Sequence, residues 1–176
     1  MTIVVTGGGS GGHITPILAV AHELKQLHPE ARIVYIGQAG DPFAEIPKSD
    51  PNIDAVYVVS AGKFRRYYGE GIKQLFDFKT MYLNFRDLFR IMSGFFQSRR
   101  LLRKLDPVVI FTRGGYVSVP VAMAGKTKGI PFITHDSDAI PSLANRIIAR
   151  WAARNAVALP TDIYPYDQSK TVTVGV

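Results

Sequence analysis

The chain has 176 residues, of which 47% are hydrophobic and 20% are charged, as is typical of one globular domain with a buried core. Because it contains no cysteine, disulfide bonds, thiolate metal sites and a cysteine nucleophile are excluded. We expect neither a signal peptide nor a membrane-spanning helix, since the first predicted strand follows Met1 and Thr2 directly and no run reaches about 18 apolar residues. The net charge of +7 is concentrated in residues 63–104, which hold eleven basic and three acidic residues.

A glycine-rich loop, Thr-Gly-Gly-Gly-Ser-Gly-Gly-His-Ile-Thr-Pro, occupies residues 6–16. It joins an apolar, β-branched run at 3–5, which predicts a buried strand, to a segment at 17–24 with apolar residues at helical spacing. Glycines let the backbone approach a ligand closely, and the first amides of a helix lack intrahelical partners, so the loop predicts an anion site suited to diphosphate. Its predicted binding residues are Gly9, Ser10, Gly11 and Gly12. A tight turn without a ligand is the alternative.

The same loop also fits the Gly-x-Gly-x-x-Gly spacing of dinucleotide-binding enzymes, through Gly7, Gly9 and Gly12. Those enzymes use an acidic residue about 20 positions further on, at the end of the second strand, to hold a ribose. Here the first acid after the second predicted strand is Asp41, which lies 29 residues past Gly12. The pattern therefore disfavours an NAD site.

Predicted strands and helices alternate along the rest of the chain. Further strands are expected at 33–36, 55–59, 108–111, 131–134, 156–158 and 172–174. Helices are expected at 72–105, as one or two helices broken near 77–80, at 117–128, and from Pro141 to about Arg154, with a loop or short helix at 41–49. This alternation predicts an α/β fold with a doubly wound, Rossmann-like parallel sheet.

Three unusual loops follow predicted strands, at residues 7–13, 113–118 and 135–140. Ligands of such sheets bind beyond the carboxyl ends of the strands. Because all three loops lie at those ends, we expect them to form a single site. Within them His13 is a candidate base, since an imidazole titrates near neutral pH and a helix amino terminus favours its uncharged form.

Together these loops resemble the amino-terminal half of the MurG family, which transfers N-acetylglucosamine from the UDP-sugar to a lipid-linked muramyl-pentapeptide. The resemblance rests on three ordered stretches: Gly8–His13 with Pro16, Gly114–Ser118 with Pro120, and Ile130-Pro131 with His135 and Ala144–Arg146. It implies the amino-terminal half of a GT-B glycosyltransferase: residues 1–176 form one acceptor-binding domain, and the donor-binding carboxy-terminal domain lies outside this chain. It also implies no cofactor and no metal ion. We expect the chain to fold alone and to transfer no sugar.

The resemblance also implies roles for individual residues. His13 is the candidate catalytic base, and Asp138 and Asn145 are candidate contacts on the donor side. Further acceptor or diphosphate contacts are expected from Gly114, Gly115, Tyr116, Ser118 and His135. Where the family usually has His-Glu-Gln-Asn, this chain has His-Asp-Ser-Asp at 135–138, so Asp138 cannot donate an amide hydrogen bond. Asp136 is a candidate to orient the His135 ring, and we interpret Asp136 and Asp138 as loop caps rather than as a metal site.

Large apolar residues crowd the segment 76–96. They are Phe76, Phe78, Met81, Tyr82, Leu83, Phe85, Leu88, Phe89, Ile91, Met92, Phe95 and Phe96. We expect half of them to line the core, and the surplus, with Lys73, Lys79, Arg86 and Arg90, to form an interfacial membrane patch. Changing these four cations to glutamate is expected to release the domain from anionic membranes with little loss of thermal stability. A nucleic-acid surface and a plain solvated basic face are the competing interpretations.

The expected partners are UDP-N-acetylglucosamine, bound mostly by the absent domain, a polyprenyl-diphosphate-linked acceptor and an anionic membrane surface, without nucleic acid. The expected location is the cytoplasmic face of the bacterial membrane. Two alternatives stay open. One is a non-enzymatic domain that binds an anionic lipid or nucleotide, and the other is the membrane subunit of a split dolichol-linked transferase.

Overall fold

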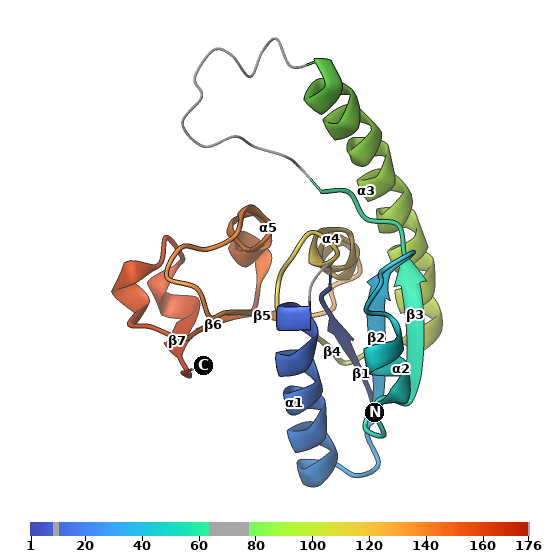
Figure 1. The fold of residues 1–176 in the computed structure, drawn as a ribbon. Helices are drawn as coiled ribbons and strands as arrows, with labels where there is room; N and C mark the ends of the chain where they lie inside the picture. Colours follow the sequence, from blue (N-terminus) through green and yellow to red (C-terminus); the bar gives the residue numbers. More distant parts are fainter. Residues whose placement is uncertain (9–10, 64–77, 176) are drawn as a thin grey trace.

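The computed structural model describes residues 1–8, 11–63 and 78–175 and shows one seven-stranded sheet flanked by helices (Figure 1). The strands are β1 (Thr2–Thr6), β2 (Arg32–Gln38), β3 (Ala55–Val59), β4 (Val109–Thr112), β5 (Phe132–Asp136), β6 (Arg154–Val157) and β7 (Thr171–Thr173). The α-helices are α1 (Gly11–Leu27), α2 (Glu45–Ser49), α3 (Phe78–Leu105), α4 (Ser118–Thr127) and α5 (Leu143–Ile148). The predicted site residues Gly9, Ser10 and Lys73, and also Phe76, lie outside the described residues.

The strand order is β3-β2-β1-β4-β5-β6-β7, and every neighbouring pair is parallel. The chain winds outward from β1 to β3, returns through α3, and then winds the other way from β4 to β7. This arrangement confirms the predicted doubly wound α/β fold. The winding direction changes between β1 and β4, and a crevice at the carboxyl end of such a pair is the common ligand site of this fold.

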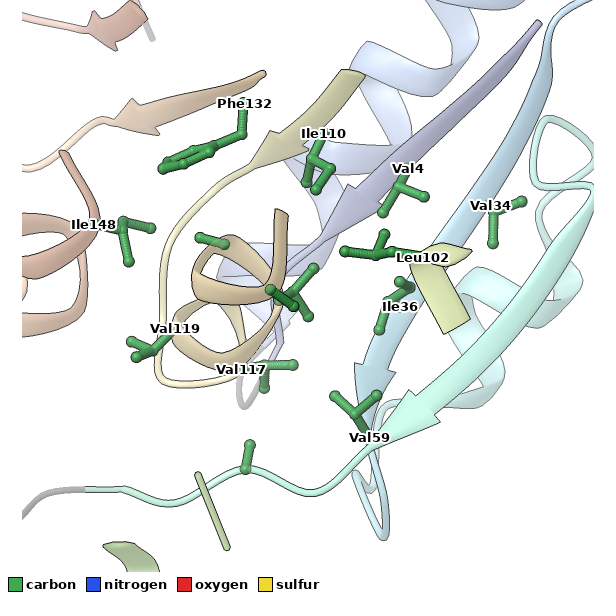
Figure 2. Packing of buried hydrophobic residues seen from close by; sticks show 14 of the residues in the cluster. Val4, Val34, Ile36, Val59, Leu102, Ile110, Val117, Val119, Phe132 and Ile148 are labelled. Atoms are coloured by element: carbon green, nitrogen blue, oxygen red, sulfur yellow. The ribbon is translucent and has the colours of Figure 1, made fainter. Parts of the chain in front are cut away.

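Along each central strand, successive side chains point alternately into two separate hydrophobic cores, one on each face of the sheet. In β1, Val4 faces a core shared with α3, α4 and α5, whereas Ile3 and Val5 face a core shared with α1. Figure 2 shows the first core, where Leu102 lies next to Val4 and Ile36, and Ile110 lies on the other side of Val4. Because both faces are covered near the switch between β1 and β4, the loops that follow these two strands start from a rigid base.

Helix α3 buries a narrow stripe at helical spacing. The buried residues are Asp87, Ile91, Gly94, Ser98, Leu102 and Leu105. Most of the large apolar side chains face solvent: Phe78, Met81, Tyr82, Phe85, Leu88, Phe89, Met92 and Phe96. The expectation that half of the apolar residues would line the core is therefore wrong, because the amino-terminal part of α3 runs past the end of the sheet (Figure 1). Residues 72–77 of the predicted helix lie outside the described residues, and α3 is continuous from Phe78 onward, so the break near 77–80 stays a prediction.

Gly94 brings α3 against the segment that follows β3. A methyl group at Gly94 would lie 1.9 Å from the backbone oxygen of Ser60. We expect Gly94→Ala to lower the free energy of unfolding by about 1–3 kcal/mol, because overpacking at a backbone contact outweighs the helix propensity of alanine. Urea unfolding tests this, with the exposed neighbour Met92→Ala as a control that should stay within about 0.5 kcal/mol of wild type. A Gly94→Ala protein as stable as the control would contradict the tight contact.

The helix predicted from Pro141 to Arg154 is shorter and begins later. The hydroxyl of Ser142 accepts a hydrogen bond from the backbone N–H of Asn145, so Ser142 caps α5 and Pro141 lies outside it. After Ile148 the chain forms a 3-10 turn, η2 (Ala149–Trp151), and enters β6 at Arg154. The short α5 keeps Asn145 in the first turn of the helix, where it can reach the end of β5. No helix in the described ranges 1–8, 11–63 and 78–175 is long and apolar enough to cross a membrane.

Candidate functional site

The turn after β4 is held by hydrogen bonds within it. The hydroxyl of Thr112 accepts from the backbone N–H of Gly114 at 3.0 Å and donates to the Ser118 hydroxyl. The Ser118 hydroxyl in turn donates to the carbonyl of Gly114 at 2.6 Å. Ser118 is fully buried, so its hydroxyl shapes the turn and presents no exposed face to a ligand. The Gly114 amide is likewise engaged, which corrects the expectation that Gly114 and Ser118 contact diphosphate directly.

The two glycines of this turn are required by their backbone and their neighbours. Gly114 has φ +84° and Gly115 has φ +80°, a region that other residues adopt only with strain. A methyl group on Gly114 would lie 2.1 Å from Oδ1 of Asn145, which is 3% exposed. Asn145 also donates from Nδ2 to the carbonyl of His135 at 3.4 Å. The glycine turn, α5 and the end of β5 are thus joined through one asparagine, and a donor-side role for Asn145 stays a prediction.

His13 lies in the first turn of α1, beside the second glycine turn. A methyl group on Gly115 would lie 3.7 Å from Cδ2 and 3.8 Å from Nε2 of His13, so the imidazole faces the glycine backbone. Partial burial, followed by the nearby charge of Arg113, lowers the pKa of His13 below its usual value, and Asp138 and Asp136 oppose this effect. His13 is therefore uncharged at neutral pH, which is the form that a general base requires.

His135 occupies the fourth position of β5 and reaches the same region from the other side of the switch point. Its Nε2 is 3.4 Å from the carbonyl of Gly175, and burial, then Arg113, lowers its pKa. Asp136 does not orient the ring, because its carboxylate accepts a hydrogen bond from Tyr166 at 2.8 Å. Successive side chains of a strand point to opposite faces, so the predicted His135–Asp136 pair is wrong.

Arg113 is the residue at this site that the sequence analysis did not single out. It is 8% exposed and donates from Nη2 to the Ser137 hydroxyl at 2.5 Å, while its Nε has no partner among the described residues. Its charge acts on both His13 and His135. In the sequence, the signal that could have identified Arg113 was a cation at the end of a buried strand, just before two glycines. A buried guanidinium whose charge reaches both imidazoles provides positive charge where an anionic ligand would bind.

The remaining predicted residues surround this centre. Burial lowers the pKa of Arg113, and the charges of Asp136 and of Asp138, which is exposed on the loop after β5, oppose that shift. Tyr116 donates its hydroxyl to Oε1 of Gln38 at 2.5 Å, and burial raises its pKa. Gly12 is exposed in the first turn of α1. Across the part of the chain that the structure describes, no group of three or more His, Cys, Asp or Glu side chains forms a metal site.

Asp41 lies nearer the first glycine loop than its place in the sequence suggests. The Asp41 carboxylate would be 3.0 Å from a methyl group on Gly8, and it accepts a hydrogen bond from the backbone N–H of Phe43 at 3.0 Å. A carboxylate repels phosphate, so the Gly8 side of the loop disfavours an anion. The side that faces His13 carries the positive charge of Arg113, which Asp136 and Asp138 partly offset, and is the better anion site.

The cations predicted for the membrane patch have different neighbours. Arg86 donates from Nε and Nη2 to Oδ1 of Asp87 at 3.1 and 3.0 Å, and Arg90 reaches the same oxygen at 3.5 Å. The Asp87 side chain is 2% exposed. Arg86 and Arg90 therefore neutralise a buried carboxylate, and the expectation that glutamate replacements would leave thermal stability nearly unchanged is not compatible with this ion pair. Lys79 is exposed on the same helix.

The two histidines predict a pH dependence of stability. A histidine whose pKa is lower in the folded chain binds fewer protons than in the unfolded chain, so the free energy of unfolding falls as the pH drops below about 6.5. We expect a loss between pH 7 and 5.5 of at most about 1.4 kcal/mol per pH unit for each histidine, reduced because both rings are partly exposed to solvent. Urea unfolding in phosphate-free buffer tests this, and the His13→Asn/His135→Asn variant should show a flatter curve. Equal slopes for the two proteins would contradict the lowered pKa values.

Comparison with known proteins identifies the family. Residues 3–157 match the family model described as the glycosyltransferase family 28 N-terminal domain. The chain is 39% identical over 173 residues to a protein of Clostridium kluyveri and 35% identical over 176 residues to one of Bacillus cytotoxicus. Both are named UDP-N-acetylglucosamine--N-acetylmuramyl-(pentapeptide) pyrophosphoryl-undecaprenol N-acetylglucosamine transferase. The matches cover 98% and 99% of this chain but 44% of each relative, so the chain spans less than half the length of these proteins.

Solved structures agree on the fold. The crystal structure of Acinetobacter baumannii MurG superposes with a TM-score of 0.74 at 23% identity, covering 98% of this chain and 45% of that protein. The UDP-GlcNAc 2-epimerase of Neisseria meningitidis superposes with a TM-score of 0.65 at 12% identity, covering 98% of this chain and 45% of that one. With nearly its whole length matched by one family model and by these relatives, the chain belongs to the glycosyltransferase family 28 N-terminal domain family.

Proposed function

We propose that this chain is the acceptor-binding half of an inverting glycosyltransferase of peptidoglycan synthesis. In this proposal N-acetylglucosamine moves from UDP-N-acetylglucosamine to a polyprenyl-diphosphate-linked muramyl-pentapeptide. The observation that carries it is the meeting of His13, Arg113 and the second glycine turn at the switch between β1 and β4. The family match and the names of the relatives support the same activity. A non-enzymatic nucleotide- or lipid-binding domain would not need an uncharged base at this place.

The site residues have different roles in the proposed reaction. The acceptor hydroxyl oxygen attacks the anomeric carbon of the sugar, and the bond from that carbon to the UDP oxygen breaks as the new bond forms. His13 accepts the hydroxyl proton, because its lowered pKa keeps it uncharged at neutral pH. Arg113 and the amides at the start of α1 supply positive charge for the acceptor diphosphate. The donor sugar is bound mainly by the domain that this chain does not contain.

A chimera tests the activity. Residues 1–176 would replace the matched part of the Clostridium kluyveri relative, and transfer of labelled N-acetylglucosamine from UDP-N-acetylglucosamine to the lipid-linked acceptor would be measured. We expect the chimera to transfer sugar and the 176-residue chain alone to transfer none. A folded chimera that binds UDP-N-acetylglucosamine but transfers nothing would contradict the proposed function. Turnover by the isolated chain would contradict its assignment as an acceptor half.

We also propose that the exposed face of α3 binds an anionic membrane, which would place the protein on the cytoplasmic face of the bacterial membrane. Phe78, Phe85 and Phe89 are 77%, 62% and 55% exposed, an unusual density of aromatic surface on one helix. Lys79 and the basic carboxyl-terminal turn of α3 add attraction to anionic lipid. The apolar surface has no counterpart in a nucleic-acid interface, where phosphate contacts dominate.

Vesicle co-sedimentation tests this membrane assignment. We expect Phe85→Ser/Phe89→Ser to reduce binding to anionic vesicles at least tenfold, since insertion of two aromatic rings is lost. Leu27→Ser/Ile163→Ser removes two exposed apolar side chains elsewhere and should leave binding unchanged. Binding of wild type to RNA or DNA but not to vesicles would overturn the assignment.

A further inference from the structure

A cavity of about 200 Å³ lies directly behind the second glycine turn, between α3, α4 and α5. Gly115 and Tyr116 form the end nearest the site. Apolar side chains from all three helices form the rest of the wall: Ile91, Val119, Leu143, Ala144 and Ile147. The cavity is separate from the crevice at His13, which does not line it.

Gly115 connects this cavity to the candidate anion site. One side of its backbone faces the His13 ring, and the same residue lines the cavity. Lys63 and Ser142 also line the cavity, and the rest of the wall is mostly apolar. On its other side the cavity is bounded by Ile91, which is buried on α3, while the adjacent residue Met92 is exposed on the outer face of that helix. The order in space is therefore anion site, apolar cavity, exposed apolar helix.

We propose that this cavity holds the isoprene units next to the diphosphate of the acceptor. The inference rests on the proposed function, because it assumes a prenyl diphosphate as the acceptor anchor. A prenyl diphosphate joins a dianionic head directly to a hydrocarbon chain, so its binding site needs an apolar cavity in contact with the anion site. The sugar and peptide parts of the acceptor are polar and would leave their hydrogen-bonding groups unpaired in such a wall. A nucleotide base meets a similar obstacle, because the wall offers few polar side chains, Ser142 and Lys63 among them, to its several polar groups.

Titration of the 176-residue chain with two soluble probes, inorganic pyrophosphate and geranyl diphosphate, tests the proposal. We expect geranyl diphosphate to bind at least tenfold more tightly than pyrophosphate, because only the former fills the cavity. Ala144→Trp should abolish this tenfold preference without changing pyrophosphate affinity, and Ala144→Leu should reduce it partly. Ile147→Trp fills the cavity from the next turn of α5. It provides a second measurement of the affinity ratio if Ala144→Trp fails to fold. Ala153→Trp, at an exposed position, is the matched control.

The outcomes separate this inference from the proposed function. Equal affinity of wild type for both probes would overturn the cavity assignment and leave the anion site intact. Failure to bind either probe would overturn the cavity assignment together with the acceptor site itself. A third outcome is that Phe85→Ser/Phe89→Ser removes the preference for geranyl diphosphate while the Ala144→Trp and Ile147→Trp variants keep it. The hydrocarbon part of the probe would then lie on the outer face of α3, and the cavity assignment would be wrong.

Discussion

His13→Ala is expected to lower sugar transfer by the chimera by about 100- to 10,000-fold, the usual contribution of a general base. The loss should appear in kcat, because the residue acts on a proton that moves only during the reaction. His13 lies against Gly115 and has a pKa below its ordinary value, so it is the uncharged imidazole nearest the glycine turn. Steady-state transfer of labelled sugar, measured at saturating acceptor, tests this expectation.

His22→Ala is the matched control for that experiment. His22 lies on the same helix but is exposed to solvent, and its replacement should leave turnover unchanged. A His13→Ala chimera with nearly full kcat would show that His13 positions the acceptor or caps the helix instead. A selective rise in KM would instead identify His13 as an acceptor contact.

The second large effect concerns stability. Arg86→Glu/Arg90→Glu is expected to lower the free energy of unfolding by about 3–5 kcal/mol, since it removes two cationic partners of a buried carboxylate. The Asp87 side chain is 2% exposed and accepts hydrogen bonds from both arginines. The two new carboxylates would add repulsion to this loss. Urea unfolding monitored by circular dichroism measures the change.

Two further variants make this result specific. Lys79→Glu/Arg100→Glu changes the net charge equally on exposed positions of the same helix and should stay within about 0.5 kcal/mol of wild type. Adding Asp87→Asn to Arg86→Glu/Arg90→Glu should restore part of the lost stability, because the buried charge is then removed. If the double glutamate variant unfolded like the control, the ion pairs at Asp87 would not stabilise the fold.

These ion pairs also change how the membrane assignment must be tested. Glutamate variants of Arg86 and Arg90 would weaken vesicle binding by partial unfolding as well as by loss of charge. The aromatic pair Phe85 and Phe89 is the better target, because both side chains are more than half exposed and belong to no core cluster of the described residues. Removing them should leave the free energy of unfolding nearly unchanged.

The sequence by itself determined the fold class and the edge of the sheet at which the candidate site lies. Periodicity of apolar residues is a local property, and alternating buried strands and helices leave few parallel arrangements once right-handed crossovers are imposed. The strand at 55–59 was predicted with the bounds of β3. The convergence of three loops also followed from topology, since each comes after a strand of one parallel sheet, and His13 and the second glycine turn do lie together.

Only the tertiary structure decided which side chains meet at that edge. Arg113 is buried beside His13 because β4 lies next to β1, a pairing between residues more than 100 positions apart. Asp136 turned out to bind Tyr166 instead of His135, because neighbouring strand residues face opposite ways and Tyr166 arrives from beyond β6. The exposed aromatics of α3 could not be separated from core residues by spacing, since that depends on where the sheet ends. Such facts depend on long-range packing, and local sequence patterns carry no information on which distant side chain completes a contact.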